Sequence, residues 1–159
     1  MRVGIIGYGV VGKTRYHSIL KNTSFQVTSI SENNSQAREE IPENIEVFNN
    51  YKSLIENANV DIVFISLPNK FAANATMLSL KKGLHVFCEK PPAKTLAQLA
   101  EVFLVSQQYP DLKLMYGFNH RFHHSVEHAK LIIEDNSLGR LINMRGVYGK
   151  SQMISFNQS

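Results

Sequence analysis

Three glycines near the start of the chain have the types and spacing of a phosphate-binding loop. Gly7, Gly9 and Gly12 follow an apolar run over residues 2–6 and open a predicted helix. In such a loop Gly7 permits a tight turn, Gly9 lets the backbone approach a pyrophosphate, and Gly12 allows the helix to pack closely on the strand. The amides at the start of the helix then face the phosphates. The predicted cofactor-binding loop consists of Gly7, Tyr8, Gly9, Val10, Val11 and Gly12.

An acidic residue follows at the spacing that dinucleotide sites use. Glu32 comes twenty residues after Gly12, at the end of the second predicted strand, and Asn33 is next to it. A carboxylate at this place accepts hydrogen bonds from the adenosine ribose and repels a 2′-phosphate, which favours NAD over NADP as the cofactor. Two plainer readings stay open, a glycine-rich turn without a ligand and a solvated loop carboxylate.

A second segment with chemical potential is Cys88-Glu89-Lys90-Pro91-Pro92. It follows a predicted strand over residues 84–88, and the carboxyl ends of parallel strands are where open α/β sheets bind ligands. Lys90 is expected near the nicotinamide end of a cofactor, where it can donate to a substrate oxygen or take part in proton transfer. A cis bond before Pro91 would fix the sharp turn. The alternative is an exposed lysine before a helix.

The elements that must position these residues alternate between strand and helix from the first residue. This alternation predicts an α/β fold with a doubly wound parallel sheet. The predicted strands are 2–6, 25–31, 47–48, 60–67, 84–88 and 112–118. The predicted helices are 9–21, a turn at 53–57, one ending at 81–83 and one opening at 95. The helix after 95 is expected to present Leu96, Leu99, Ala100, Phe103 and Leu104 on one face, and Phe64, Phe87 and Phe103 are expected in the core.

The character of the chain changes after about residue 120. A helix with an apolar face over 126–133, a turn at 135–139 and a strand over 140–150 are predicted there. His120, His124 and His128 would share one face of a helix, but no Cys or carboxylate completes a ligand set, so a polar face is favoured over a metal site. We expect two domains, 1–120 for the cofactor and 121–159 as the beginning of a second.

Composition, charge and cysteine count exclude several classes of protein. The chain has 159 residues, of which 43% are hydrophobic and 19% charged, as expected of a globular protein. The net charge of +4 is scattered, without a nucleic-acid motif, and the apolar run over 60–67 is too short to span a membrane. Cys88 is the single cysteine, so an internal disulfide is excluded. The start lacks a signal peptide, which predicts a cytoplasmic protein without nucleic-acid or membrane partners.

Four segments together resemble the Gfo/Idh/MocA oxidoreductases, the glucose-fructose oxidoreductase and inositol dehydrogenase family. They are the sequences at residues 4–12, 67–69, 83–91 and 117–122. The resemblance implies an N-terminal Rossmann domain that binds NAD or NADP and a C-terminal α/β substrate domain. It also implies hydride transfer between a nicotinamide and a sugar, nucleotide sugar or cyclitol. By the same resemblance the cofactor-lining residues include Ser66, Leu67, Pro68, Asn69, Glu89 and Lys90, and the catalytic residues are Lys90 and Asn119.

The chain departs from the family pattern in two places. The family commonly has a His four residues after the Pro of Leu-Pro-Asn, where this chain has Ala72. The family's Asp and His for proton transfer have no match after Gly149, so the sequence reads as a cofactor half with a truncated second domain. A non-catalytic dinucleotide-binding module or degenerate fragment is therefore the alternative; a methyltransferase shares the glycine loop but does not explain Glu-Lys-Pro. The predicted strand over 141–147 would be unpaired, which predicts a homo-oligomer formed through it.

Overall fold

The computed structural model describes residues 1–147 and 149. The chain divides into two compact units, residues 1–118 and residues from 119 onward. The described part of the second unit contains a 3-10 helix, η1 (Asn119–Phe122), and one α-helix, α6 (His124–Glu134). Within the described residues, no helix combines the length and apolar character needed to cross a bilayer.

The first unit is built on six parallel strands. They are β1 (Arg2–Ile6), β2 (Gln26–Ser31), β3 (Glu46–Phe48), β4 (Ile62–Ile65), β5 (His85–Cys88) and β6 (Leu114–Tyr116). Their order across the sheet is β3-β2-β1-β4-β5-β6, and every neighbouring pair is parallel. The order reverses between β1 and β4, which is the point where doubly wound sheets open a crevice for ligands. The predicted doubly wound parallel sheet is confirmed.

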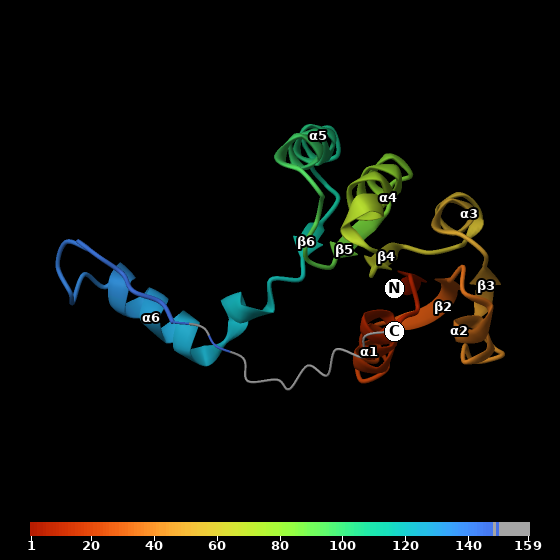
Figure 1. The fold of residues 1–159 in the computed structure, drawn as a ribbon, viewed down its shortest axis with the longest axis horizontal. Helices are drawn as coiled ribbons and strands as arrows, with labels where there is room; N and C mark the ends of the chain where they lie inside the picture. The colour runs from red at the N-terminus through yellow and green to blue at the C-terminus, as the bar shows by residue number, and fades with distance from the viewer. Residues whose placement is uncertain (148, 150–159) are drawn as a thin grey trace, which may run out of the picture. The chain divides into compact units, whose positions relative to one another are not determined.

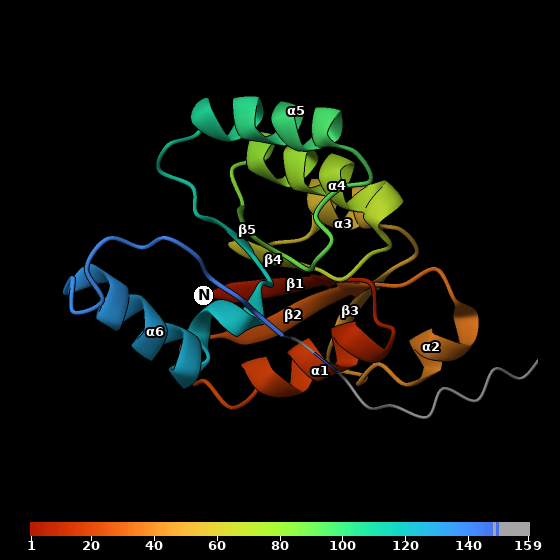
Figure 2. The ribbon, with the colours of Figure 1, turned by 60° about the vertical axis from the view of Figure 1, so that its left-hand side comes forward.

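Helices cover both faces of this sheet. The α-helices of the first unit are α1 (Val10–Ile19), α2 (Ser35–Glu39), α3 (Tyr51–Asn57), α4 (Asn69–Lys81) and α5 (Leu96–Gln107). Figures 1 and 2 show α3, α4 and α5 on one side of the sheet and α1 on the other. Local signals set the helix ends, since the Thr95 side chain accepts from the Gln98 amide at 3.2 Å and Gly83 follows α4 with φ of +83°.

Two apolar clusters form the core, one on each side of the sheet. In β4 the alternation is direct, because Val63 and Ile65 are buried in the cluster that includes α4, whereas Ile62 and Phe64 pack against the cluster that includes α1. Phe64 stacks on Phe87 with ring centroids 5.0 Å apart. Both rings are only half-buried, so the prediction that they belong to the core holds in part.

The predicted inner face of α5 is wrong. The helix buries Val102 and Val105, while Leu96, Phe103 and Leu104 are 85%, 61% and 63% exposed. Apolar residues occupy more than one side of this helix, so periodicity alone did not determine which side packs. The position of α4 against α5 decides it, and the larger side chains are left outside.

The predicted strand over 140–150 is also wrong where the structure describes it. Residues 140–147 and 149 have no strand conformation, and 148 and 150 lie outside the described residues. A strand is stable only when a neighbour satisfies its backbone N–H and C=O groups. The described part of the second unit offers no such neighbour. The homo-oligomer expected through this segment stays a prediction.

Candidate functional site

The glycine loop leaves the end of β1 with a backbone that side chains would block. Gly7 has φ of +89°, and a Cβ there would lie 2.7 Å from the Ser66 carbonyl oxygen. A Cβ on Gly12 would lie 2.0 Å from the Gly7 carbonyl oxygen. Gly9 differs, because no atom lies within 4 Å of the place its Cβ would take. The fold itself therefore requires glycine at 7 and 12, whereas the space beside Gly9 is open to a ligand.

Helix α1 presents an uncapped N-terminus beside this space. Its N-cap is Gly9, which has no side chain to accept from the first amides, and the first turn contains no acidic residue. Val10 and Val11 are 84% and 46% exposed. The positive end of the helix dipole is thus not neutralised by the protein, which is the arrangement that binds phosphate.

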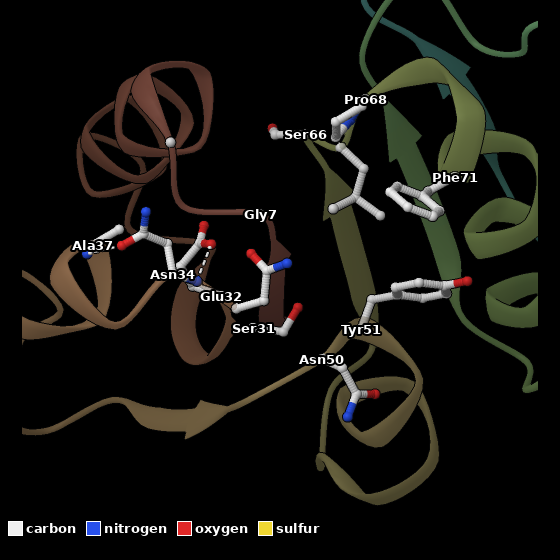
Figure 3. A pocket seen from close by; sticks show the side chains of 13 residues that line it. Gly7, Ser31, Glu32, Asn34, Ala37, Asn50, Tyr51, Ser66, Pro68 and Phe71 are labelled. Atoms are coloured by element: carbon white, nitrogen blue, oxygen red, sulfur yellow. Dashed lines mark hydrogen bonds between the residues drawn. The ribbon is translucent and has the colours of Figure 1, made fainter.

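Glu32 is fixed at the same loop by two backbone amides. The amide of Tyr8 donates to Glu32 Oε2 at 2.7 Å. The amide of Asn34 donates to Oε1 at 2.9 Å (Figure 3). Each carboxylate oxygen accepts one of these bonds and keeps capacity for another. The Tyr8 ring is buried against Tyr16, with centroids 5.9 Å apart, and this burial raises the pKa of Tyr8. Because the Tyr8 and Asn34 amides hold it in place, the Glu32 carboxylate is positioned to accept hydrogen bonds from ligand hydroxyls.

These groups lie at a pocket with a volume of about 520 Å³. The pocket opens at the carboxyl ends of β1, β2 and β4, where the strand order reverses. Its size falls within the range of about 300–1,000 Å³ that is usual for small-molecule sites. It is lined by Gly7, Gly9, Ser31, Glu32, Asn33, Asn34, Ala37, Asn50, Tyr51, Ser66, Leu67, Pro68 and Phe71 (Figure 3).

The pocket brings together seven of the predicted cofactor residues and adds six that the sequence reasoning missed. The seven are Gly7, Gly9, Glu32, Asn33, Ser66, Leu67 and Pro68. The six are Ser31, Asn34, Ala37, Asn50, Tyr51 and Phe71. Among the added residues, Tyr51 and Phe71 place their rings 6.5 Å apart on the side of the pocket nearest α4. Phe71 lies two residues after Asn69, so the Leu-Pro-Asn motif was the signal that pointed to this wall.

The residues present fit a dinucleotide. The Ser66 hydroxyl oxygen is buried and has no hydrogen-bond partner within the described chain, although Ser66 lines the pocket. A buried hydroxyl without a partner is costly, and a ligand group or an ordered water at this place would satisfy it. The open space beside Gly9 and the uncapped α1 would suit a phosphate, and the positioned Glu32 would suit a ribose.

The Glu89-Lys90-Pro91 segment follows β5 and lies outside the lining of this pocket. The Lys90 side chain is exposed, whereas the Glu89 side chain is only 11% exposed and is paired with Arg15. The predicted cis bond before Pro91 is confirmed. Burial raises the pKa of the Cys88 thiol to about 11, which keeps the thiol protonated at neutral pH.

Two further predicted site residues, Asn69 and Asn119, do not line this pocket. Asn69 is exposed at the first position of α4, and Asn119 begins η1 in the second unit. The histidines do not share one helix, because His120 belongs to η1 while His124 and His128 belong to α6. Within the described residues, no three His, Cys, Asp or Glu side chains are grouped as metal ligands would be.

Curated dehydrogenases are similar to this chain over most of its length. The chain is 29% identical to myo-inositol 2-dehydrogenase of Thermotoga maritima over 143 residues, which cover 88% of this chain and 42% of the relative. It is 28% identical to D-glucoside 3-dehydrogenase of Escherichia coli over 145 residues, covering 89% of this chain and 41% of the relative. The chain therefore spans less than half the length of these relatives.

Solved structures agree with this fold. The scyllo-inositol dehydrogenase of Lactobacillus casei with bound NAD(H) and scyllo-inositol matches 87% of this chain and 42% of that chain, with a TM-score of 0.79 and 28% identity. Residues 1–118 match the sequence model of the Gfo/Idh/MocA family, which is described as an oxidoreductase family with an NAD-binding Rossmann fold. The chain thus belongs to the Gfo/Idh/MocA oxidoreductase family, and its first unit is that family's NAD-binding Rossmann module.

Proposed function

We propose that this chain binds NAD as the cofactor half of a dehydrogenase that acts on a sugar or cyclitol. The observation that carries the proposal is the meeting of the glycine loop and the Glu32 carboxylate at one pocket, at the reversal of strand order. We assign cofactor binding to residues 1–120 and the beginning of the substrate domain to residues 121–159. The relatives named for inositol and D-glucoside dehydrogenation support this substrate class.

The side chains and backbone of the pocket would divide the cofactor between them. The N-terminus of α1 and the open space at Gly9 would hold the pyrophosphate. Glu32 would accept hydrogen bonds from the adenosine ribose hydroxyls, and its charge would repel the 2′-phosphate of NADP. For this reason NAD is the expected cofactor. The cofactor, when bound, supplies a nicotinamide C4 that accepts or gives up a hydride.

Lys90 and Asn119 are the proposed catalytic residues. Lys90 carries an exposed ammonium group at the carboxyl end of β5, where it would donate a hydrogen bond to the substrate hydroxyl that becomes a carbonyl. A donor there stabilises negative charge that develops on the oxygen as the hydride leaves the carbon. Asn119, which begins η1, is the second proposed catalytic residue and would hydrogen-bond to the substrate through its side-chain amide.

A thermal-shift titration tests cofactor binding. A ligand at 100 times its dissociation constant stabilises the folded protein by about 2.7 kcal/mol, which corresponds to a rise in Tm of roughly 5–10 °C for a chain of this size. We expect this rise with NAD or NADH and a smaller one with NADP or NADPH. The absence of a shift with all four would contradict the proposal.

Hydride transfer is tested separately by following NADH absorbance with myo-inositol, scyllo-inositol and glucosides. Reduction of NAD that Lys90→Met abolishes would support the catalytic role of Lys90. Cofactor binding without any turnover would instead support the second candidate, a dinucleotide-binding module. The specific observation that favours this second candidate is that Lys90 lies outside the lining of the pocket.

A further inference from the structure

Arg15 lies on α1, one turn after Gly12 at the glycine loop, and has no part in the pocket described above. Its Nε donates to Glu89 Oε1 at 2.5 Å, and a terminal guanidinium nitrogen contacts the same oxygen. The guanidinium carbon also lies 5.0 Å from the centroid of the Phe87 ring, within cation–π distance. Two residues that are 74 apart in the sequence are thus joined between α1 and the end of β5.

This pair is sheltered from solvent more than the other ion pairs of the described chain. The Arg15 and Glu89 side chains are 21% and 11% exposed, compared with 43% and 36% for Arg2 and Asp61. An ion pair in such surroundings is screened less by water and salt, and loss of one partner leaves the other charge poorly solvated. The contact therefore constrains the two segments more strongly than an exposed pair does.

Glu89 is also confined on its other sides. A Cβ on Gly117 would lie 2.7 Å from Glu89 Oε2, so the carboxylate fills space that only glycine leaves at the end of β6. The Glu89 amide donates to the Ile65 carbonyl at 2.9 Å, and the Gly117 amide donates to the Cys88 carbonyl at 2.9 Å. Glu89 is held from α1, β4 and β6, and Lys90 is the next residue in the chain.

We propose that Arg15 is a positioning residue that, through Glu89, fixes Lys90 relative to the phosphate-binding helix. Because α1 would hold the pyrophosphate and Lys90 would lie at the nicotinamide end, the ion pair sets the distance between the two ends of the cofactor site. Glu89 then acts by accepting from Arg15 instead of by touching the cofactor. The inference rests on the proposed function and deepens it by assigning a residue to the nicotinamide half alone.

The test compares two probes that share the adenosine, pyrophosphate and second ribose. NADH carries a nicotinamide and ADP-ribose does not, so their affinities for the full chain, measured by calorimetry, report the two halves separately. Lys90 is also expected to line the nicotinamide end of the cofactor, so for Arg15→Met we expect the NADH affinity to fall about tenfold and the ADP-ribose affinity to change less than twofold. Glu89→Gln should give the same selective loss, and the double variant should lose no more than either single variant.

Arg2→Met is the matched control, because it removes an arginine–carboxylate pair at the opposite end of β1 and should leave both affinities unchanged. If Arg15→Met does not fold by circular dichroism, Arg15→Lys retains the charge without the planar fork and should show a smaller selective loss. Equal loss of both probes, or no loss of NADH affinity, would overturn the positioning role. Failure of the wild-type chain to bind either probe would instead overturn the proposed function.

Discussion

The two ends of the candidate site are built by different means. The end at β1 and β2 is mostly backbone, since the glycine loop, the start of α1 and two amides that hold Glu32 define it. The end at β5 is built from side chains, since the Arg15–Glu89 pair holds the segment that contains Lys90. Backbone geometry is fixed once the strand and helix form, whereas the side-chain contact depends on packing between distant segments. We therefore expect substitutions to affect the two ends differently.

The largest effect is expected for Gly12→Ala. The new methyl group would lie 2.0 Å from the Gly7 carbonyl oxygen, so α1 must move away from β1. We expect the free energy of unfolding to fall by about 3 kcal/mol or more, measured by urea denaturation. Gly9→Ala is the control, because its methyl group meets no atom within 4 Å and its φ is −70°. Since Ala is a poorer N-cap than Gly, its unfolding free energy should fall by about 1 kcal/mol or less. Equal stability of the two variants would show that the loop geometry is wrong.

A smaller effect, on ligand choice, is expected for Glu32→Gln. The substitution keeps the size of the side chain but removes the negative charge and one acceptor oxygen. We expect the NADH affinity to fall about tenfold and the NADPH affinity to rise, both measured by calorimetry. Glu46→Gln, at the start of β3 and outside the pocket lining, is the control. An unchanged ratio of the two affinities would contradict the role of Glu32 in cofactor choice.

At the β5 end, we predict that substitutions at Gly117 and Arg15 are energetically coupled, because both positions contact Glu89. Gly117→Ala should lower the free energy of unfolding by about 1–2 kcal/mol, because its methyl group meets the fixed Glu89 carboxylate at 2.7 Å. In an Arg15→Met background the carboxylate is released and can turn away, so the same substitution should cost less than half as much. A double-mutant cycle in urea measures this difference, and simple additivity would indicate that Arg15 does not fix Glu89.

The smallest effect concerns an exposed pair far from the site. Hydrogen bonds from the Arg2 side chain and amide lower the pKa of Asp61 from 3.8 to about 2. A carboxylate with a lowered pKa in the folded state stabilises the protein at pH values above its unfolded value, and the contribution is lost as the pH falls through the folded value. The difference in urea midpoint between wild type and Asp61→Asn should therefore be constant above about pH 5 and shrink between pH 4 and 2. A difference that stays constant to pH 2 would contradict this assignment.

The backbone end of the site was largely predictable from sequence. The spacing of the three glycines and Glu32 reflects local geometry of one strand–helix–strand unit, and that geometry is what the structure has. The doubly wound parallel sheet also followed from the alternation of strand and helix, whereas the order of its strands comes from the structure. Such features are short-range in the chain, so a single sequence contains the information that specifies them.

The side-chain end and the helix faces were less predictable. Nothing in the local pattern around Arg15 indicates a partner 74 residues away, because the contact exists only after β5 is placed beside β4. The inner face of α5 was predicted wrongly for a related reason, since the packing partner selects among several apolar sides. The strand predicted over 140–150 failed where it is described because a strand-like local sequence does not supply a pairing neighbour.

The central claim, that the glycine loop binds a dinucleotide pyrophosphate, is tested most directly by titrating NADH into the wild-type chain and into Gly9→Ala. The two unfolding free energies should differ by about 1 kcal/mol or less. Only the wild type should bind, because the new methyl group occupies the space that the pyrophosphate needs. Equal NADH affinity of the two proteins, or no binding by the wild type, would contradict the claim.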